Sequence, residues 1–388
     1  MKKILVGINS IGYGGVPKSL MNFMANMKND VEIDLLLFRE DGELHHLLPQ
    51  DTNIVIPKGY MDVFVEKREQ CKKLGFKKYL FRIMMSLWTK LFKNNNMFVN
   101  YAVKHSEVLD KEYDVAICFN GVMPPTNHWR GTAEYILKNV KAKKKFAITH
   151  DDYVPSYYNK TSVKTYSQFD EVLAVSKSCC DMIANNVPAL KDKFDYCYNF
   201  CNVEEITSKT NTEIEPLEGN FKIVSATSLI PRKGIMKAVK AVERLNNEGF
   251  DITYYIIGNG GQSAEIEEYI TTHKLQDKIK MLGFKTNPFA YAKNADLFIL
   301  TSEREAAPMV YAESFVAGTP VLSTNTASAM ELVSKYGYVC DISDEGVYEG
   351  IKNVDSSIPE LKEKREKLQD YKYPNEEIKQ KWLEKFNK

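Results

Sequence analysis

The chain has 388 residues, of which 52 are Lys or Arg and 51 are Asp or Glu, and 44% are hydrophobic. This composition is ordinary for a globular protein, and the balanced charge argues against a general nucleic-acid binder. The length is sufficient for two domains with separate cores. Seven cysteines occur without a C-x-x-C pair, so we expect buried reduced thiols in a cytoplasmic protein, and neither a disulfide framework nor a zinc site.

Short apolar runs alternate with helical patterns along the chain. The first run is cut by Gly7, Asn9 and Ser10, so it predicts a buried strand and not a signal peptide. Nearly continuous apolar strands between helices indicate parallel sheets covered on both faces, which is an α/β fold. The runs lie at residues 4–8, 33–38, 115–119, 146–149 and 172–175 in the first half, and at 222–226, 252–257, 279–282, 297–300 and 321–323 in the second.

Two groups of residues in the first half follow predicted strands. Gly14 and Gly15 come after the first run, and a helix is expected to open just beyond them. His150, Asp151 and Asp152 come directly after the run at 146–149. A histidine in such a place is either structural or functional, and its position at a strand end favours a functional role.

A basic segment lies between these two groups. Residues 67–93 contain nine Lys or Arg and one acid, Glu69. On a helix from Phe76 onward, one face is apolar and the other basic. The apolar face has Leu80, Ile83, Met84, Leu87, Trp88 and Leu91, and the basic face has Lys77, Lys78, Arg82, Lys90 and Lys93. Two interpretations stay open: residues 76–93 lie on a membrane surface, or the helix packs its apolar face on the sheet.

The second half opens with residues 204–220, which are rich in Glu, Thr, Ser and Asn and predict an interdomain linker. After the strand at 222–226 comes a loop that contains Ser228, Arg232 and Lys233. Glycines at 258 and 260 follow the strand at 252–257, where they allow close approach of the backbone to a ligand. Phe284 follows the strand at 279–282, and either stacks on a base or belongs to a plain turn.

Two carboxylates, Glu305 and Glu313, are separated by seven residues after the strand at 297–300. Pro308 suits the first position of a helix, so Glu305 is expected in the loop and Glu313 on the helix. Ligands bind at the carboxyl ends of parallel strands, which is where this loop lies. The helix start at Pro308, Met309 and Val310 offers a positive end to a phosphate, with free N–H groups from the residues after the proline.

This element resembles the E-x7-E element of retaining GT-B glycosyltransferases of group 1. The sequence AGTPV at 317–321 and Glu331 also match that family, whereas Ala306 stands where glycine is frequent and Ser228 where arginine is usual. The resemblance implies two Rossmann-like domains that face a central cleft. Residues 1–203 would bind the acceptor, residues 204–370 would bind the nucleotide sugar, and the charged helix at 371–388 would pack back on the first domain.

The resemblance also implies roles for individual residues. His150, Glu305 and Lys233 would be catalytic, with Glu305 on the sugar hydroxyls and Lys233 on the diphosphate. Glu313 would bind the ribose, and Arg232 would supply the charge that Ser228 lacks. The remaining donor-side residues would be Gly15, Gly258, Gly260, Phe284, Pro308, Met309 and Val310, and the acceptor-side residues Gly14, Asp151 and Asp152.

The function implied is retaining, metal-independent transfer of a hexose from a UDP- or GDP-sugar, without a cofactor. The acceptor would be a lipid-linked saccharide or a similar molecule in surface polysaccharide (capsule) biosynthesis, at the cytoplasmic face of the membrane. Two alternatives remain: a catalytically weak GT-B protein that binds a sugar nucleotide or a partner, and a sugar-nucleotide epimerase or phosphorylase on the same fold.

Overall fold

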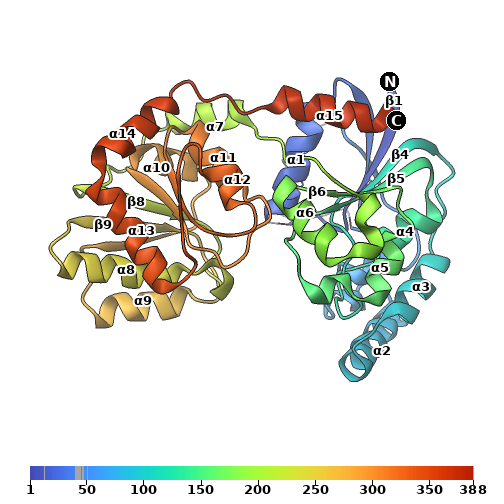
Figure 1. The fold of residues 1–388 in the computed structure, drawn as a ribbon. Helices are drawn as coiled ribbons and strands as arrows, with labels where there is room; N and C mark the ends of the chain where they lie inside the picture. The colour runs from blue at the N-terminus through green and yellow to red at the C-terminus, as the bar shows by residue number, and fades with distance from the viewer. Residues whose placement is uncertain (13, 40–44, 46–47, 50, 388) are drawn as a thin grey trace. The chain divides into compact units, whose positions relative to one another are not determined.

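The computed structural model describes residues 1–12, 14–39, 45, 48–49 and 51–387, and the chain forms two compact units (Figure 1). The first unit is Met1–Phe200 with Asn375–Lys388, and the second is Cys201–Pro374. The sequence predicts these boundaries after residues 203 and 370. Both units are α/β, with a parallel sheet between helices.

The first unit has a seven-stranded parallel sheet with the order β3-β2-β1-β4-β5-β6-β7. The order in which successive strands are added reverses at β1, because β2 lies on one side of β1 and β4 lies on the other. The strands are β1 Lys2–Gly7, β2 Val31–Leu36, β3 Asn53–Val55, β4 Glu112–Cys118, β5 Lys141–Thr149, β6 Glu171–Ala174 and β7 Phe194–Tyr196. The helices are α1 Gly15–Met27, α2 Phe76–Phe92, α3 Asn96–Lys104, α4 Thr132–Asn139, α5 Lys160–Tyr166, α6 Lys177–Asn186 and α15 Asn375–Asn387.

The C-terminal helix α15 packs on the first unit. Trp382 lies edge-on to Phe23 of α1 at a ring distance of 5.0 Å. The buried Lys385 ammonium donates to Glu171 and to Asp195, each at 2.5 Å, and both carboxylates are on neighbouring strands. Two anionic partners compensate the desolvation of one buried cation, which explains how a charged helix is held against a sheet edge.

The second unit has a six-stranded parallel sheet with the order β10-β9-β8-β11-β12-β13, which reverses at β8. Successive residues of β8, Ile223 and Val224, enter separate apolar clusters on the two faces. The strands are β8 Phe221–Ala226, β9 Ile252–Ile257, β10 Ile279–Gly283, β11 Leu297–Leu300, β12 Val321–Thr324 and β13 Tyr338–Cys340. The helices are α7 Val203–Thr210, α8 Ile235–Asn247, α9 Ser263–Thr272, α10 Pro288–Asn294, α11 Met309–Val316, α12 Ala329–Val333, α13 Asp344–Ser356 and α14 Ile358–Lys367.

The predicted linker at 204–220 is wrong in its first half. Helix α7 occupies Val203–Thr210, and its Ile206 is buried against Phe289 and Ala312. The helix is capped at its start by Asn202, whose side chain accepts from the Glu205 N–H. One buried apolar residue and an N-cap are enough to hold α7 in place, because the neighbouring helices supply the rest of the apolar cluster.

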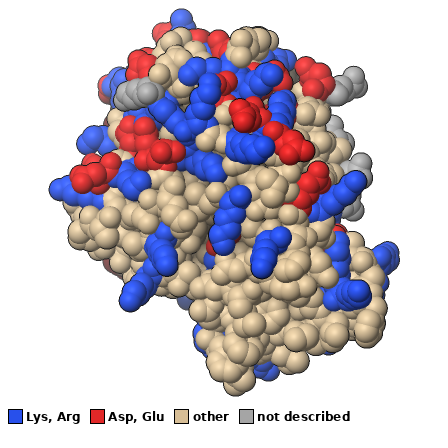
Figure 2. Space-filling view, turned by 90° about the vertical axis from the view of Figure 1, so that its right-hand side faces the viewer, with Lys and Arg blue, Asp and Glu red and all other residues tan. Residues whose placement is uncertain are grey.

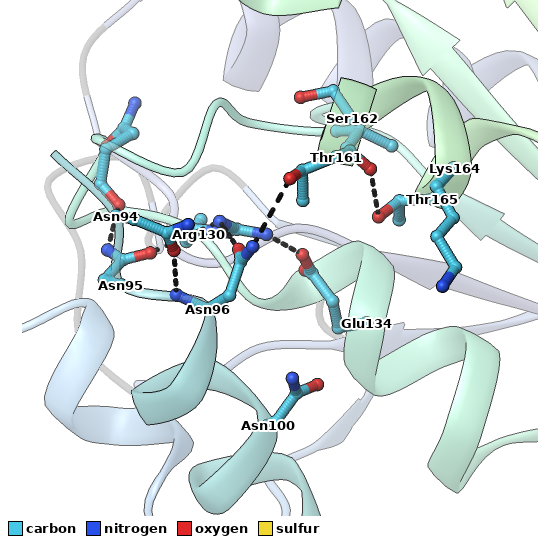
Figure 3. A network of polar contacts seen from close by, with 12 residues as sticks. Asn94, Asn95, Asn96, Asn100, Arg130, Glu134, Thr161, Ser162, Lys164 and Thr165 are labelled. Atoms are coloured by element: carbon cyan, nitrogen blue, oxygen red, sulfur yellow. Dashed lines mark hydrogen bonds and ion pairs between the residues drawn. The ribbon is translucent and has the colours of Figure 1, made fainter. Parts of the chain in front are cut away.

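Buried polar contacts fix the chain just beyond α2 (Figure 3). Arg130 donates to the side-chain oxygens of Asn95 at 3.2 Å and Asn96 at 2.7 Å, and pairs with Glu134 of α4. Asn96 reaches Thr161 of α5 at 3.5 Å. The start of α3 is therefore tied to α4 and α5, which anchors the C-terminal end of α2.

Helix α2 does not pack its apolar face on the sheet, so that interpretation is wrong. Leu87 and Leu91 are exposed, whereas Arg82, predicted on the outward basic face, is only 5% exposed. Six of the seven cysteines are buried, and Cys340 is partly exposed. Among the described residues, none of the helices combines the length and the apolar character that crossing a membrane requires.

Candidate functional site

The candidate site in the second unit lies where the strand order reverses. Strand β8 is flanked by β9 and β11, so the loops that leave β8 and β11 start side by side at the carboxyl edge of the sheet. Such a switch point is the usual ligand site of an open parallel sheet. The β8 loop carries Lys233 and the β11 loop carries Glu305.

Main-chain contacts hold these two loops together. The Thr301 hydroxyl, directly after β11, donates to the carbonyls of Lys233 at 3.2 Å and Gly234 at 2.9 Å. The Glu303 N–H donates to the Arg232 carbonyl at 2.8 Å. Gly234 has φ +62°, and a β-carbon there would lie 2.2 Å from the Thr301 carbonyl oxygen. Only glycine fits this approach, so Gly234 and Thr301 set the distance between the loops.

The contact between the loops brings Lys233 and Glu305 together. The Lys233 Nζ lies 2.5 Å from Glu305 Oε1, and the two side chains are 15% and 9% exposed. Glu303, two residues earlier in the same loop, is exposed and lies 3.7 Å from Lys237. The structure therefore selects Glu305 as the partner of Lys233. An ammonium suits a phosphate oxygen and a carboxylate suits a hydroxyl, so the pair offers two complementary contacts to a sugar phosphate.

Arg232 and Ser228 lie in the same β8 loop, and both are exposed. The Arg232 guanidinium donates to the Arg304 carbonyl at 2.8 Å, which makes it a further link between the two loops. Its suggested role as a substitute for the arginine missing at Ser228 stays a prediction.

Helix α11 starts one residue later than the sequence suggested. Pro308 is its N-cap, so Met309 and Val310 are the residues whose N–H groups open the helix. Glu313 is buried on the same helix, in the turn after these groups. The spacing therefore places the loop carboxylate Glu305 and the helix carboxylate Glu313 on either side of a positive helix end.

The glycines after β9 have a different local explanation from the one expected. A β-carbon on Gly258 would lie 1.8 Å from the Thr227 carbonyl oxygen, and one on Gly260 would lie 2.2 Å from the Leu229 carbonyl oxygen. The Leu229 N–H also donates to the Asn259 carbonyl at 3.0 Å. These glycines are needed for contact between protein loops, which supports the β8 loop. Phe284, after β10, is 56% exposed.

In the first unit, His150 follows β5 and packs against Phe119, which follows the neighbouring strand β4, at a ring distance of 5.1 Å. The residue is partly accessible, but its Nε2 is buried and has no partner among the described residues. Burial lowers the pKa of His150 to about 4, against an opposing backbone hydrogen bond with Phe119. The imidazole is therefore neutral at pH 7 and does not supply a positive charge.

The other first-unit candidates lie at the same edge of the sheet. Asp152 is buried beside the exit of β5, and Asp151 is partly exposed. Gly14 and Gly15 are exposed at the start of α1, which follows β1. Sequence reasoning missed Thr301, although a hydroxyl residue directly at the end of a buried strand was a usable signal.

The comparisons with known proteins agree with this architecture. Residues 208–373 match the family described as glycosyl transferases group 1. Two curated relatives are the amylovoran biosynthesis glycosyltransferase AmsK of Erwinia amylovora and the N-acetylgalactosamine-N,N'-diacetylbacillosaminyl-diphospho-undecaprenol 4-alpha-N-acetylgalactosaminyltransferase of Campylobacter jejuni. The first is 30% identical over 34% of this chain and 37% of its own length. The second is 27% identical over 49% of this chain and 52% of its own length, so the matches span about a third to a half of these relatives.

Among solved structures, HepE of Anabaena in complex with UDP and glucose superposes over all of both chains, with a TM-score of 0.69 and 17% sequence identity. WaaG, a glycosyltransferase involved in lipopolysaccharide biosynthesis, covers 95% of this chain and 94% of its own, with a TM-score of 0.57 and 11% identity. The fold is thus the GT-B fold, with two Rossmann-like units. The second unit matches the glycosyl transferases of group 1 over residues 208–373.

Proposed function

We propose that the chain is a retaining glycosyltransferase that moves a hexose from a UDP- or GDP-sugar to a lipid-linked saccharide in surface polysaccharide biosynthesis. The observation that carries the proposal is the Lys233–Glu305 pair at the switch point of a group 1 domain. The names of the relatives support the acceptor class, since one of them carries a diphospho-undecaprenol acceptor in its name. The UDP in the HepE structure supports the donor class.

The donor would bind with its diphosphate between Lys233 and the start of α11. An ammonium has three N–H donors, so Lys233 can keep its contact with Glu305 and donate to a phosphate oxygen at the same time. The N–H groups of Met309 and Val310 would donate from the helix end, where the helix dipole favours negative charge. Glu313 would accept from the ribose hydroxyls, and the free oxygen of Glu305 from hydroxyls of the sugar.

In the reaction, the bond between the anomeric carbon and the diphosphate oxygen breaks, and the electron pair leaves with the diphosphate. Positive charge develops on the sugar ring, and negative charge on the diphosphate is stabilised by Lys233 and the α11 N–H groups. The acceptor hydroxyl forms the new bond on the same face of the sugar and passes its proton to the departing phosphate oxygen. No metal ion takes part in this scheme, because the lysine and the helix end supply the positive charge.

His150 has the role of positioning in this scheme. With a pKa of about 4 its ring is neutral at the working pH, so it hydrogen-bonds without adding charge. Asp151 and Asp152 would orient the acceptor hydroxyl.

A panel of UDP, GDP, ADP and CMP sugars in a thermal-shift assay tests the donor site. Ligand at about one hundred times its Kd stabilises the folded state by about 2.7 kcal/mol, so a true donor raises the melting temperature measurably. We expect a UDP- or GDP-sugar to do so, followed by slow release of the nucleotide in the absence of acceptor. No shift with any member of the panel would refute the proposal.

A second function is favoured by one observation, the serine at 228 with Arg232 already bound to the Arg304 carbonyl. Fewer cations at the diphosphate would weaken catalysis more than binding, which describes a sugar-nucleotide-binding protein with little turnover. The same panel separates the two functions. A thermal shift without nucleotide release or transfer, in the presence of a lipid-linked acceptor, identifies the binding protein.

A further inference from the structure

Helix α2 carries an apolar stripe on its outer side. Phe76, Leu87 and Leu91 are 77%, 64% and 74% exposed, and Leu80 and Met84 are exposed as well. We call these five residues the α2 apolar face. Their spacing of three or four residues places them along one side of the helix. A helix on the surface of a globular protein normally turns such a stripe toward the core.

The orientation of α2 is fixed by contacts on its inner side. Arg82, Met85 and Thr89 are buried there. Near the start of the helix, Lys78 donates to Asp62 at 2.5 Å. Turning the leucines inward would expose Met85 and break the Lys78–Asp62 pair, so the α2 apolar face points away from the unit in its folded state.

The exposed apolar surface continues onto α3. Phe98 of α3 is buried against Phe81, at a ring distance of 5.3 Å, and also contacts Trp88 at 6.5 Å. These contacts join the two helices, and Met97 and Tyr101 of α3 remain exposed. Apolar surface that extends over two helices marks an interaction site more often than an isolated exposed leucine does.

The exposed charge that borders this surface is mostly positive. Five exposed lysines border it and form no ion pair with any residue in the described part of the chain: Lys72, Lys73, Lys77, Lys90 and Lys93. Figure 2 shows the same contrast, with Asp and Glu gathered in the upper part of the view and a mostly uncharged lower part bordered by Lys and Arg. Lysines have long stems that keep the ammonium in a polar layer while the stem lies along an apolar one.

We propose that α2 lies on the surface of an anionic lipid bilayer, with the α2 apolar face in the interface and the bordering lysines at the phosphate groups. The exposed apolar side chains match the acyl region of such a bilayer, and the unpaired lysines match its anionic headgroups. The inference is independent of the proposed function, because it needs neither donor nor acceptor. If this inference and the proposed function both hold, α2 places the chain on the membrane surface in which a lipid-linked acceptor is anchored.

The test is co-sedimentation of the purified full chain with vesicles of phosphatidylcholine and phosphatidylglycerol in equal parts, compared with phosphatidylcholine alone. We expect binding to the anionic vesicles, and its weakening between about 50 mM and about 500 mM salt as the charges are screened. The double variant Leu87→Ser/Leu91→Ser should bind at least about tenfold more weakly, since both side chains lose their apolar burial in the interface. Met182→Ser, an exposed methionine on α6, is the matched control and should bind like the wild type.

A second variant, Lys77→Glu/Lys90→Glu, covers the case in which the serine variant folds poorly, because neither lysine forms an ion pair that the fold needs. It should lose binding to the anionic vesicles and keep the wild-type melting temperature. The proposal is overturned if the wild type does not bind the anionic vesicles, or if the charge variant binds them unchanged. It is also overturned if the wild type instead forms a concentration-dependent dimer that Leu87→Ser/Leu91→Ser dissociates, which would make this surface a contact between copies of the chain.

Discussion

Removal of the Lys233 ammonium should destabilise the second unit even when no donor is present. Lys233→Met leaves the Glu305 carboxylate, 9% exposed, without its cation at 2.5 Å. Breaking a buried pair from one side costs about 3–5 kcal/mol, and the 15% exposure of Lys233 places the expected loss near the lower end, about 3 kcal/mol. For a domain of about 150–250 residues, this lowers the melting temperature by about 6–12 °C.

The assay is a double-mutant cycle, with the free energy of unfolding measured by denaturant and the melting temperature by calorimetry. Glu305→Gln and Lys233→Met are each measured alone and together. The double variant should be more stable than the sum of the single losses predicts, by about 1–3 kcal/mol, because neither charge is then left alone. Lys209→Met is the matched control in the same unit, since Lys209 pairs with Glu205 at 2.6 Å on one helix and the two side chains are 43% and 34% exposed. Its loss should stay near or below about 1 kcal/mol.

The buried-pair interpretation fails if Lys233→Met is no more destabilising than Lys209→Met, or if the cycle shows no coupling. Donor binding is then measured in the same variants by the thermal shift that the nucleotide sugar produces. Lys233→Arg keeps a cation beside Glu305 and should keep part of the shift, whereas Lys233→Met should lose most of it. A Lys233→Met protein with the full donor shift would move the diphosphate site elsewhere, even if the stability cycle behaves as expected.

Three further variants test other parts of the structure. Glu313→Ala should weaken nucleotide binding by roughly 1.5–3 kcal/mol in titration calorimetry, and an unchanged Kd would remove Glu313 from the ribose site. Burial lowers the pKa of His150 in the folded state to about 4, below the ordinary value of 6.5. The folded state therefore has its full stability above pH 6.5 and loses about 3 kcal/mol of it as the pH falls toward 4, because the unfolded chain takes up the proton first. The difference in unfolding free energy between wild type and His150→Gln should follow that window, and a difference that is flat with pH would contradict the burial of the ring. Arg82→Met should leave the melting temperature unchanged or raise it, because Nε and Nη1 of Arg82 are buried without partners among the described residues. A loss above about 2 kcal/mol would mean that the guanidinium is satisfied by contacts that the structure does not show.

The parts of the fold that sequence predicted are those with a strong local signal. Strands β1, β4, β8 and β9 are continuous apolar runs, so their presence and parallel arrangement could be read directly. The positions of Lys233 and Glu305 could be read for the same reason, because each follows such a strand by a few residues. Parallel strands put those loops at one edge, and the order of the strands put them side by side.

Other parts depend on contacts between distant residues and leave little trace in the local sequence. Strand β3, Asn53–Val55, has only three residues and exists because β2 is there to pair with it. Helix α7 depends on Ile206 meeting Phe289 and Ala312. Arg82 was predicted on the outward basic face, but it is buried. An arginine in a basic stretch is normally solvated, and only the packing around α2 turns this one inward.

The glycines after β9 have a structural role that the local sequence did not reveal. Gly258 and Gly260 were expected to make room for a ligand, yet their missing β-carbons make room for the carbonyls of Thr227 and Leu229. That contact holds the β8 loop, and the β8 loop in turn carries Lys233 to Glu305. A β-carbon at Gly260 would therefore act on the site indirectly, by moving the loop and lengthening the ion pair. The glycines build the frame of the candidate site, and that frame positions the charged side chains that we propose bind the donor.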